Sequence, residues 1–554
     1  MTYPIVNVAA RLTEQARAAP DRLAIMVALP RVESGKRQYQ SLTFRELDED
    51  SDRIAAGLAR MGVVPGTRLA LLVKPGIDFI SLVFALFKAG AVSILIDPGM
   101  GRRNLIACLE AARPDGFIAI SPVQAVRTVL RRFSHARLNV TVGRRWFWGG
   151  PTLSQLRAAA AGGPQMAATA ADDPAAIIFT TGSTGPPKGV LYRHGNFESQ
   201  VEQLRSFYGI EPGEVDLACF PLFGLFNCAL GVTTVVPDMD ASRPAMCDPA
   251  SLVEAMTDGG ATQSFASPAV WNRVGPYCAA HGLRLPTLKR AMSAGAPVPP
   301  YVLERMKACL ADDGEMHTPY GATEALPVAS ISASEVLSET APRCRQGAGV
   351  CVGRRFPGIE WKIIAAVDGP IATLAAATEL PSGEIGELIV RGPAVTREYV
   401  TRTEWNARAK ISDGESFWHR MGDVGYFDER ERFWYCGRLA HRVLTADGPM
   451  YTERCEAIFN EHPSVYRSAL VGIGPRGRQR PVIVIEPLVD RLPETAADYE
   501  ALVGEVLRLG AGNPLTAPIR DALIHSSFPV DIRHNAKIFR EQLAPWAEQE
   551  LSGG

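Results

Sequence analysis

The first hundred residues alternate between segments with helical spacing of apolar residues and short apolar runs. Residues 50–61 place apolar side chains at helical spacing, and residues 77–88 do so again before the chain reaches Gly90. Residues 68–73 and 91–96 are short apolar runs typical of buried strands. Helices that alternate with such strands favour an α/β fold with largely parallel sheets.

The rest of the chain contains two stretches that predict connections. Residues 158–174 are rich in alanine and glycine and have little to bury, so we expect a connector that leads into the next strand. Residues 365–382 predict a loop before the apolar run 385–390. A chain of 554 residues, 47% of them apolar, is too long for one ordinary domain, so we expect at least two.

The segment 144–148, Arg-Arg-Trp-Phe-Trp, joins basic and aromatic side chains. This combination occurs on membrane-binding and protein-docking surfaces, but a strand with alternating burial explains it as well. Of these two interpretations, the sequence favours the strand.

Charge and cysteine content limit the class of partner and the compartment. Lysine and arginine total 58 against 59 acidic residues, so we expect small-molecule or protein partners and no nucleic acid. Ten cysteines without a Cys-x-x-Cys pair predict reduced, mostly buried thiols and no zinc site. No signal-peptide pattern opens the chain, and the apolar stretch 79–87 is too short to span a bilayer. We therefore expect a cytoplasmic protein that is not transmembrane.

The most informative segment is a loop of hydroxyl residues and glycines that follows the apolar run 174–179. Its glycines allow a close backbone approach to polyphosphate, and its hydroxyls and lysine suit anionic oxygens. It is not a Walker A loop, because Gly189 follows the lysine where Ser or Thr is required. A surface turn is the alternative, but so many phosphate-binding groups favour a nucleotide site. The predicted phosphate contacts are Thr180, Thr181, Gly182, Ser183, Thr184, Gly185 and Lys188.

Four further segments, in this order along the chain, resemble motifs of the acyl-adenylate-forming superfamily, which includes acyl-CoA synthetases, luciferases and peptide-synthetase adenylation domains. The resemblance covers nearly the whole chain. The segments are Ser293-Ala294-Gly295-Ala296-Pro297, Tyr320-Gly321-Ala322-Thr323-Glu324, Trp418-His419-Arg420-Met421-Gly422-Asp423 with Gly437-Arg438 after it, and the stretch from Pro529 to Ile538 that contains Lys537.

The resemblance implies a role for each matching residue. The turn at Ser293, Ala294, Gly295 and Ala296 would border adenine, and the ring of Tyr320, followed by Gly321, would lie against it. The Thr323 hydroxyl would contact the α-phosphate and Glu324 would bind magnesium, although Thr-Glu alone is also typical of a helix start. Asp423 would accept the ribose hydroxyls, with Arg438 at the hinge.

The resemblance of its segment to the C-terminal loop of the superfamily implies that Lys537 is the adenylation lysine. A cation between the carboxylate substrate and the α-phosphate would stabilise charge that develops in the transition state. The implied cofactors are ATP and Mg²⁺. His419 is interpreted as structural, because this position varies in the superfamily. The implied fold has a large α/β N-terminal domain of several subdomains with layered sheets and helices, residues 1–436. A small, mobile α+β lid domain, residues 437–554, would follow.

Three departures from the superfamily pattern bear on the reaction. Gly224 follows Phe223 where a histidine or a large aromatic residue is common, which predicts either a roomier acyl pocket or an altered start of the next helix. Ala440 and His441 stand where Asp or Lys and then an acidic residue are common at the hinge, and residues 531–537 lack the usual Pro-Lys-Thr pattern. Together these departures resemble the β-lactone-forming members that act in bacterial long-chain olefin biosynthesis.

That resemblance implies adenylation of a hydrophobic 2-alkyl-3-hydroxy acid, followed by attack of its own β-hydroxyl on the acyl carbon. A general base is expected near the hydroxyl, with His317 and His194 as candidates. Implied protein partners are the β-lactone decarboxylase of the pathway, a hydrolase-fold enzyme, and its reductase. The alternatives are a long-chain fatty acyl-CoA ligase and a non-catalytic sensor that binds ATP or acyl-adenylate.

Overall fold

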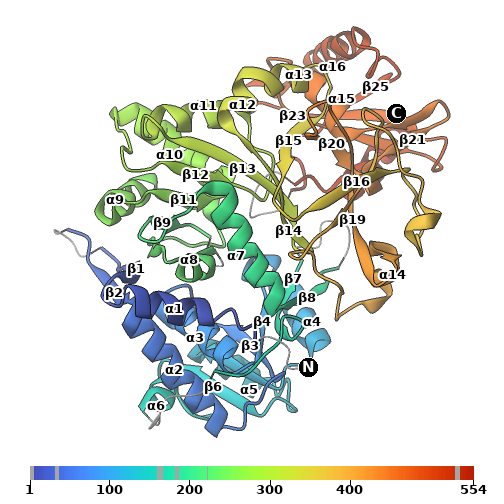
Figure 1. Ribbon diagram of the computed structural model, residues 1–554. Coiled ribbons are helices and arrows are strands. Elements are labelled where there is room, and N and C mark those ends of the chain that lie inside the picture. The colour runs from blue at the N-terminus through green and yellow to red at the C-terminus, as the bar shows by residue number, and fades with distance from the viewer. Residues whose placement is uncertain are drawn as a thin grey trace.

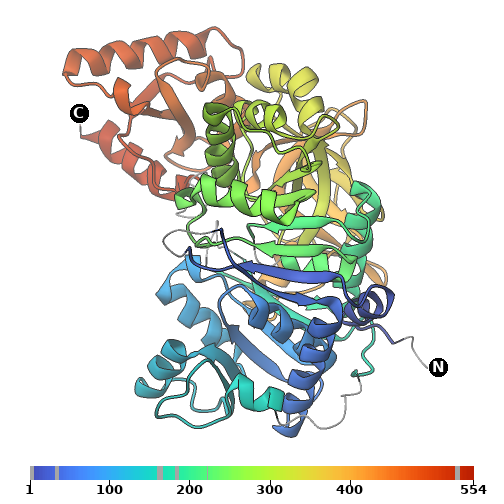
Figure 2. The same ribbon diagram turned by 90° about the vertical axis from the view of Figure 1, so that its left-hand side faces the viewer.

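The computed structural model describes residues 5–31, 36–158, 166–180, 186–220, 223–530 and 537–553. In Figures 1 and 2 the chain runs from a lower body in blue, through a central body in green and yellow, to an upper body in orange and red. Helices and strands alternate through most of the described chain, which confirms the predicted α/β class. Among the described helices, none has the length and apolar character needed to cross a membrane.

Helix α2 (Phe44–Arg60) shows how a local signal sets an element's start. Thr43 accepts a hydrogen bond from the Glu46 amide at 3.2 Å, and the Glu46 carboxylate accepts one from the Thr43 amide at 2.8 Å. This capping box begins the helix six residues before the predicted segment 50–61. Helix α1 (Ala10–Ala18) packs against α2.

The lower body contains a six-stranded sheet in the order β6-β5-β3-β4-β7-β8. Its strand pairs are parallel except β7–β8, as predicted for an α/β layer. The strands are β3 (Arg68–Leu72), β4 (Val92–Leu95), β5 (Gly116–Ile120), β6 (Leu138–Val142), β7 (Pro174–Phe179) and β8 (Gly189–Arg193); the helices are α3 (Ile77–Lys88), α4 (Arg102–Ala112), α5 (Ser121–Val129) and α6 (Leu153–Ala158).

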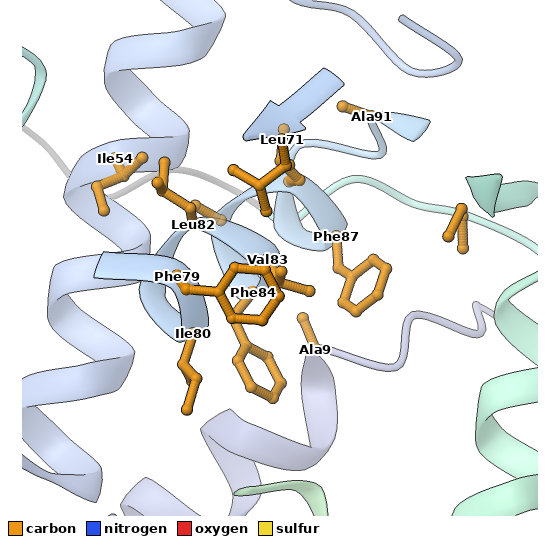
Figure 3. Close-up of a cluster of buried hydrophobic side chains, with 14 of the residues drawn as sticks. Ala9, Ile54, Leu71, Phe79, Ile80, Leu82, Val83, Phe84, Phe87 and Ala91 are labelled. Atoms are coloured by element: carbon orange, nitrogen blue, oxygen red, sulfur yellow. The ribbon is translucent and has the colours of Figure 1, made fainter. Parts of the chain in front are cut away.

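Helix α3 matches the predicted segment 77–88 and forms the centre of the lower core. Figure 3 shows its side chains, including Phe79, Leu82 and Phe87, packed together with Ile54 of α2 and Leu71 of β3. Even its terminal Lys88 is buried, and its ammonium binds Asp48 at 2.6 Å and Asp52 at 2.5 Å. The core can hold this charge because both carboxylates neutralise it.

The central body is built on a fourteen-stranded sheet, in the order β16-β17-β19-β20-β15-β14-β13-β12-β11-β9-β10-β1-β2, with β18 paired to β19. The pairs from β1 to β13 are parallel, whereas those from β13 to β16 are antiparallel, so the prediction of largely parallel sheets is wrong for this half. Short connections join two of these antiparallel pairs, β13–β14 and β19–β20, whereas parallel neighbours need a longer crossover.

The bounds of these strands are β1 (Leu23–Ala28), β2 (Tyr39–Thr43), β9 (Val215–Ala218), β10 (Thr233–Val236), β11 (Gln263–Ala266), β12 (Arg290–Ser293), β13 (Glu315–Ala322), β14 (Ala325–Ser332), β15 (Val350–Arg355), β16 (Glu360–Ile364), β17 (Gly386–Arg391), β18 (Lys410–Asp413), β19 (Ser416–Phe427) and β20 (Phe433–Arg438). The helices are α7 (His194–Tyr208), α8 (Phe223–Leu230), α9 (Pro249–Gly259), α10 (Pro268–His281), α11 (Pro300–Cys309), α12 (Ala333–Glu335), α13 (Ala341–Arg345) and α14 (Asn406–Ala409).

The upper body follows β20 and has its own small sheets. Strand β24 pairs antiparallel with β23 and parallel with β25, and helices α15 and α17 pack on this sheet. The elements are β21 (Val443–Thr445), β22 (Gly448–Met450), α15 (Thr452–Phe459), β23 (Val465–Ile473), β24 (Arg480–Pro487), α16 (Ala496–Ala511), β25 (Asp521–Ile524) and α17 (Arg540–Ser552).

Two local predictions have clear outcomes. All ten cysteines are free, and all but the partly exposed Cys344 are buried, as predicted. The strand predicted over Arg144–Trp148 is wrong, because the segment is irregular and carries Trp146 and Phe147 on the surface. The residues around it explain the failure, since Gly143, Gly149 and Gly150 surround it and Gly143 and Gly150 have positive φ angles.

Candidate functional site

A cleft of about 2790 Å³ receives residues from all three bodies. The lower body contributes Leu71 and Lys188, the central body contributes Tyr320 and Asp423, and the upper body contributes Glu453. Residues that are far apart in the sequence therefore share one solvent-accessible space.

The predicted phosphate loop connects β7 to β8. Its base is closed by two hydrogen bonds: the Thr180 amide donates to the Lys188 carbonyl at 3.0 Å, and the Lys188 amide donates to the Thr180 hydroxyl at 3.1 Å. Thr180 and Lys188 both line the cleft. The remaining predicted contacts, Thr181, Gly182, Ser183, Thr184 and Gly185, lie outside the described residues.

Two aromatic rings hold the side chain of Lys188. Its ammonium nitrogen lies 4.5 Å from the centre of the Trp405 ring and 5.2 Å from that of Tyr399. Tyr399 also donates its hydroxyl to Glu324 Oε1 at 2.6 Å. Burial lowers the pKa of Lys188, and the charge of Glu324 opposes that shift. The lysine and the carboxylate thus meet around the same aromatic pair.

Thr323 and Glu324 form the turn between β13 and β14, so the helix start that this pair could also indicate is absent here. The Thr323 carbonyl accepts the Tyr192 hydroxyl at 2.5 Å, and the Glu324 carbonyl accepts the Thr396 amide at 2.9 Å. A Cβ at Gly321 would lie 2.7 Å from the Ala325 carbonyl oxygen, so glycine permits this tight turn. The turn directs a nearly buried Glu324 carboxylate to the cleft.

Asp423 is the centre of a buried polar group. Asp423 and Arg438 are cross-strand partners on β19 and β20, and Asp423 Oδ1 lies 2.9 Å from the Arg438 guanidinium. The Tyr320 hydroxyl donates to the other carboxylate oxygen, Oδ2. Burial raises the pKa of Asp423, while the charge of Arg438 and the Tyr320 hydrogen bond oppose the rise. The structure thus brings together three residues from two separate motifs.

Lys537 also lines this cleft. Its positive charge opposes the rise in the pKa of Asp423 and contributes to the low pKa of His441. Lys537 therefore interacts electrostatically with both residues. The predicted adenylation lysine and the predicted ribose contact therefore line the same cleft.

The turn after β12 carries the residues predicted to border adenine. Ser293, Ala294, Gly295 and Ala296 all line the cleft. Gly295 has φ +95°, a left-handed conformation that glycine adopts without steric cost. Its backbone can therefore turn along the cleft wall.

The acyl-pocket departure has a structural explanation. A Cβ on Gly224 would lie 3.1 Å from the Thr234 methyl and 3.5 Å from Ile80 Cδ1. The glycine thus lets α8 pack closely on β10 and α3, which favours the altered helix start over the roomier pocket. The neighbouring Leu225 and Phe226 line the cleft.

The two histidines predicted as candidate bases do not line the cleft. His194 is fully buried and its Nδ1 accepts the Val8 amide at 3.4 Å, and burial lowers the pKa of His194 to about 4. The His317 ring packs edge-on against Tyr208 at 5.1 Å, and burial lowers the pKa of His317 to about 4. Both rings are packed against other parts of the protein and neither forms part of the cleft wall.

Two other histidines among the described residues do line the cleft, His419 and His441. His419 is buried, and its Nδ1 lies 3.1 Å from the Ala409 carbonyl, which agrees with a structural role. Burial, with Arg540, Arg438 and Lys537 nearby, lowers the pKa of His441 to about 3. Burial also lowers the pKa of His419 well below its usual range, so both imidazoles are neutral near neutral pH.

Tyr399, Trp405 and Glu453 are cleft residues that the sequence motifs did not indicate. Tyr399 and Trp405 precede the short helix α14, and they reach Lys188 from more than two hundred residues away. A single aromatic residue outside the motifs carries no sequence signal for such a contact.

Comparison with known proteins agrees with this arrangement. The model of the AMP-binding enzyme family matches residues 12–400. The chain is 49% identical to the olefin beta-lactone synthetase of Xanthomonas campestris pv. campestris, covering 99% of this chain and 98% of that protein. It is 48% identical to the olefin beta-lactone synthetase of Stenotrophomonas maltophilia, covering 98% of each.

Solved structures show the same fold at lower identity. The amide bond synthetase McbA from Marinactinospora thermotolerans superposes with a TM-score of 0.76 at 21% identity, covering 97% of this chain and 99% of that one. The O-succinylbenzoate coenzyme A synthetase of Bacillus subtilis, in complex with ATP and magnesium ion, gives 0.74 at 20% identity, covering 96% and 98%.

Proposed function

This chain belongs to the AMP-binding enzyme family, and from that premise we infer that it is an ATP-dependent β-lactone synthetase of olefin biosynthesis. It adenylates a 2-alkyl-3-hydroxyalkanoic acid, and the acid's own β-hydroxyl then closes the lactone ring. The observation that carries this proposal is the 49% identity, over nearly the whole chain, with a relative named for that activity.

In the first step, a carboxylate oxygen of the substrate attacks the α-phosphorus of ATP and pyrophosphate leaves. This converts a carboxylate, whose oxygen is a poor leaving group, into an acyl-adenylate whose leaving group is AMP. We assign Lys537 to the charge that develops between the carboxylate and the α-phosphate, because its ammonium lines the cleft near Asp423.

The remaining polar residues of the cleft are proposed to hold the nucleotide. Asp423 accepts the ribose hydroxyls and Tyr320 lies against adenine, with the turn from Ser293 to Ala296 on its border. Thr180, Lys188 and Thr323 contact the phosphates. Support for this arrangement is the hydrogen bond from Tyr320 to Asp423, which links the proposed adenine and ribose contacts.

Glu324 fits a magnesium ion bound mainly by phosphate oxygens. One carboxylate oxygen of Glu324, Oε1, accepts the Tyr399 hydroxyl, and the residue lines the cleft, so the other oxygen, Oε2, could bind the ion. Mg²⁺ commonly takes only one or two protein carboxylates, and phosphate and water complete its shell. When bound there, the ion would neutralise phosphate charge, while Tyr399 fixes the orientation of the carboxylate.

In the second step, the β-hydroxyl oxygen attacks the acyl carbon, the bond to AMP breaks, and the hydroxyl proton is released. The nucleophile is part of the same molecule, so no second substrate must bind and the proximity advantage is large. The cleft also needs to exclude water from the acyl-adenylate. We propose that residues 437–554 form a lid domain that closes on residues 1–436 for this purpose.

We also propose a cellular setting. Ten free cysteines support a reducing compartment, and we place the enzyme in the cytoplasm. Association with the β-lactone decarboxylase and the reductase of the pathway would pass the hydrophobic lactone onward without its release into water.

The decisive experiment supplies ATP, magnesium and a syn-2-alkyl-3-hydroxy acid, with and without CoA, and identifies the products by NMR. Lactone, AMP and pyrophosphate formed without CoA are the expected result. A thioester that requires CoA, with no lactone, would instead identify a fatty acyl-CoA ligase. Omitting magnesium in a third reaction tests whether adenylation depends on the ion.

A further inference from the structure

The lower body carries an exposed apolar surface on two neighbouring segments. These are helix α5 with the residue after it, and the irregular segment that follows β6. The Ser121 hydroxyl at the start of α5 donates to the Arg144 carbonyl at 2.5 Å and so joins the two segments. Their exposed apolar side chains are Val126, Val129, Leu130, Trp146 and Phe147. We call this set the α5 surface.

Trp148 fixes the aromatic part of the α5 surface to the protein. Its indole is buried and donates to the Thr141 hydroxyl at 2.8 Å. The rings of Trp146 and Phe147 lie 5.4 Å and 5.1 Å from that of Trp148, yet they remain 54% and 64% exposed. Two large rings are therefore held at the surface by an anchored neighbour. Burying them against a partner would remove apolar area from water, which favours binding.

The stretch of chain that carries these side chains is strongly basic. Residues 101–150 contain nine arginines against two carboxylates, Glu110 and Asp115, whereas the whole chain has a net charge of −1. Only one of these arginines, Arg132, forms an ion pair in the described structure, at 2.7 Å from Glu110. The arginines are Arg102, Arg103, Arg113, Arg127, Arg131, Arg132, Arg137, Arg144 and Arg145.

We propose that the α5 surface docks on an anionic phospholipid bilayer. Tryptophan and phenylalanine rings insert at the boundary between headgroups and acyl chains, and arginines bind the phosphates of the headgroups. A bilayer supplies both an apolar layer and a dense array of negative charge, so it matches the two chemical features of this surface together.

The position of α5 connects this surface to the cleft. Ile120, directly before α5, and Val123 within it line the cleft, as does Leu105 of α4. Helix α5, which carries part of the α5 surface, therefore also forms part of the apolar cleft wall. If the substrate is a two-chain hydroxy acid, which rests on the proposed function, docking would let it pass from the bilayer to the cleft with little exposure to water.

The test is cosedimentation of the full-length protein, without nucleotide, with vesicles of phosphatidylcholine alone or of phosphatidylcholine mixed with phosphatidylglycerol. We expect binding to the anionic vesicles that weakens as salt is added. The pair Arg131→Glu and Arg144→Glu should reduce this binding at least about tenfold, since each basic residue near an anionic surface contributes to affinity. Trp146→Ser with Phe147→Ser should reduce binding to a similar extent.

The matched control reverses two exposed arginines of the upper body, Arg478→Glu and Arg520→Glu, which change the net charge by the same amount. Vesicle binding by this control should equal that of the parent protein. The proposal is overturned if the parent protein does not bind anionic vesicles, or if both charge-reversed proteins lose binding equally. The first result would favour a protein partner for the α5 surface, and the second would show that binding follows the net charge and not this surface.

A separate measurement keeps this proposal distinct from the proposed function. Pyrophosphate release from a short, water-soluble hydroxy acid, without vesicles, should be the same for the parent protein and for the α5-surface variants. Vesicle binding with no pyrophosphate release by the parent protein would contradict the proposed function and leave the docking surface supported.

Discussion

The ammonium group of Lys188 lies over the ring of Trp405, 4.5 Å from its centre. Trp405 ends a short helical turn, Thr403–Trp405, and lines the cleft together with Lys188. An aromatic face attracts a cation, so the ring restricts where the lysine side chain can go. Trp405 is therefore a positioning residue for the cation that we assign to the phosphates.

Replacing Trp405 by leucine should weaken ATP binding. A cation–π contact is worth about 1 kcal/mol, which corresponds to about fivefold in affinity. Trp405→Phe keeps an aromatic face and should retain most of the affinity. The KM for ATP and the rate of pyrophosphate release, measured for both variants, check this. Equal KM values for the leucine and phenylalanine variants would show that the ring acts only by filling space.

Lys537→Ala should slow adenylation by about 10² to 10³, the usual effect of removing one well-placed stabilising group. The step is measured by exchange of labelled pyrophosphate into ATP. Lactone closure from a synthetic acyl-adenylate should change much less, because the lysine is assigned to the first step.

The control for Lys537 is Lys289→Ala, which removes an exposed lysine of the same charge from another part of the surface. If Lys537→Ala exchanged pyrophosphate at the parent rate, the catalytic assignment would be wrong and a non-catalytic nucleotide sensor would be favoured.

The buried pair Asp423 and Tyr320 leads to a graded prediction for nucleotide binding. Asp423→Asn keeps the shape of the side chain but removes the charge that pairs with Arg438, so AMP affinity should fall about 10- to 100-fold. Tyr320→Phe removes one hydrogen bond and should cost less. Calorimetric titration with AMP measures both, and thermal unfolding reports whether each variant is folded. Unchanged affinity in folded Asp423→Asn would remove Asp423 from the ribose site.

Local signals in the sequence predicted much of the lower body. Helix α3 matches the predicted segment because its apolar spacing ends at a glycine, and these signals lie within a few residues of the helix. The start of α2 was predicted too late, although the Thr43 and Glu46 capping box is itself a local signal. The strand predicted over Arg144–Trp148 failed because local pattern does not tell which rings a tertiary contact will bury.

The candidate functional site shows even more clearly that local sequence patterns do not predict tertiary contacts. The motifs predicted Tyr320, Glu324, Asp423 and Lys188, but not the bonds among them, since Tyr320 and Asp423 are 103 residues apart. No local sequence signal predicted that Trp405 would contact Lys188. The candidate bases were chosen by residue type alone, but the His194 ring is fully buried, binds the Val8 amide and does not line the cleft.

Glu453 is a further cleft residue whose protonation affects stability. It lies on α15 near Glu456, whose carboxylate binds Arg540 at 2.6 Å. Burial, and then the charge of Glu456, raise the pKa of Glu453 from 4.5 to about 7. Between these two pH values the folded protein binds this proton more tightly than the unfolded chain does. The free energy of unfolding contributed by Glu453 therefore falls as the pH rises through this window.

Glu453→Gln removes this titration, because its amide stays neutral at every pH. The variant should unfold at a higher temperature than the parent protein at about pH 8, where the parent carries this partly desolvated charge, and the advantage should shrink towards about pH 5. Thermal midpoints across that range measure the difference. Glu500→Gln, at an exposed position of α16, should follow the parent curve throughout. Curves for Glu453→Gln and the parent that run parallel would mean that the Glu453 carboxylate ionises equally easily in both states.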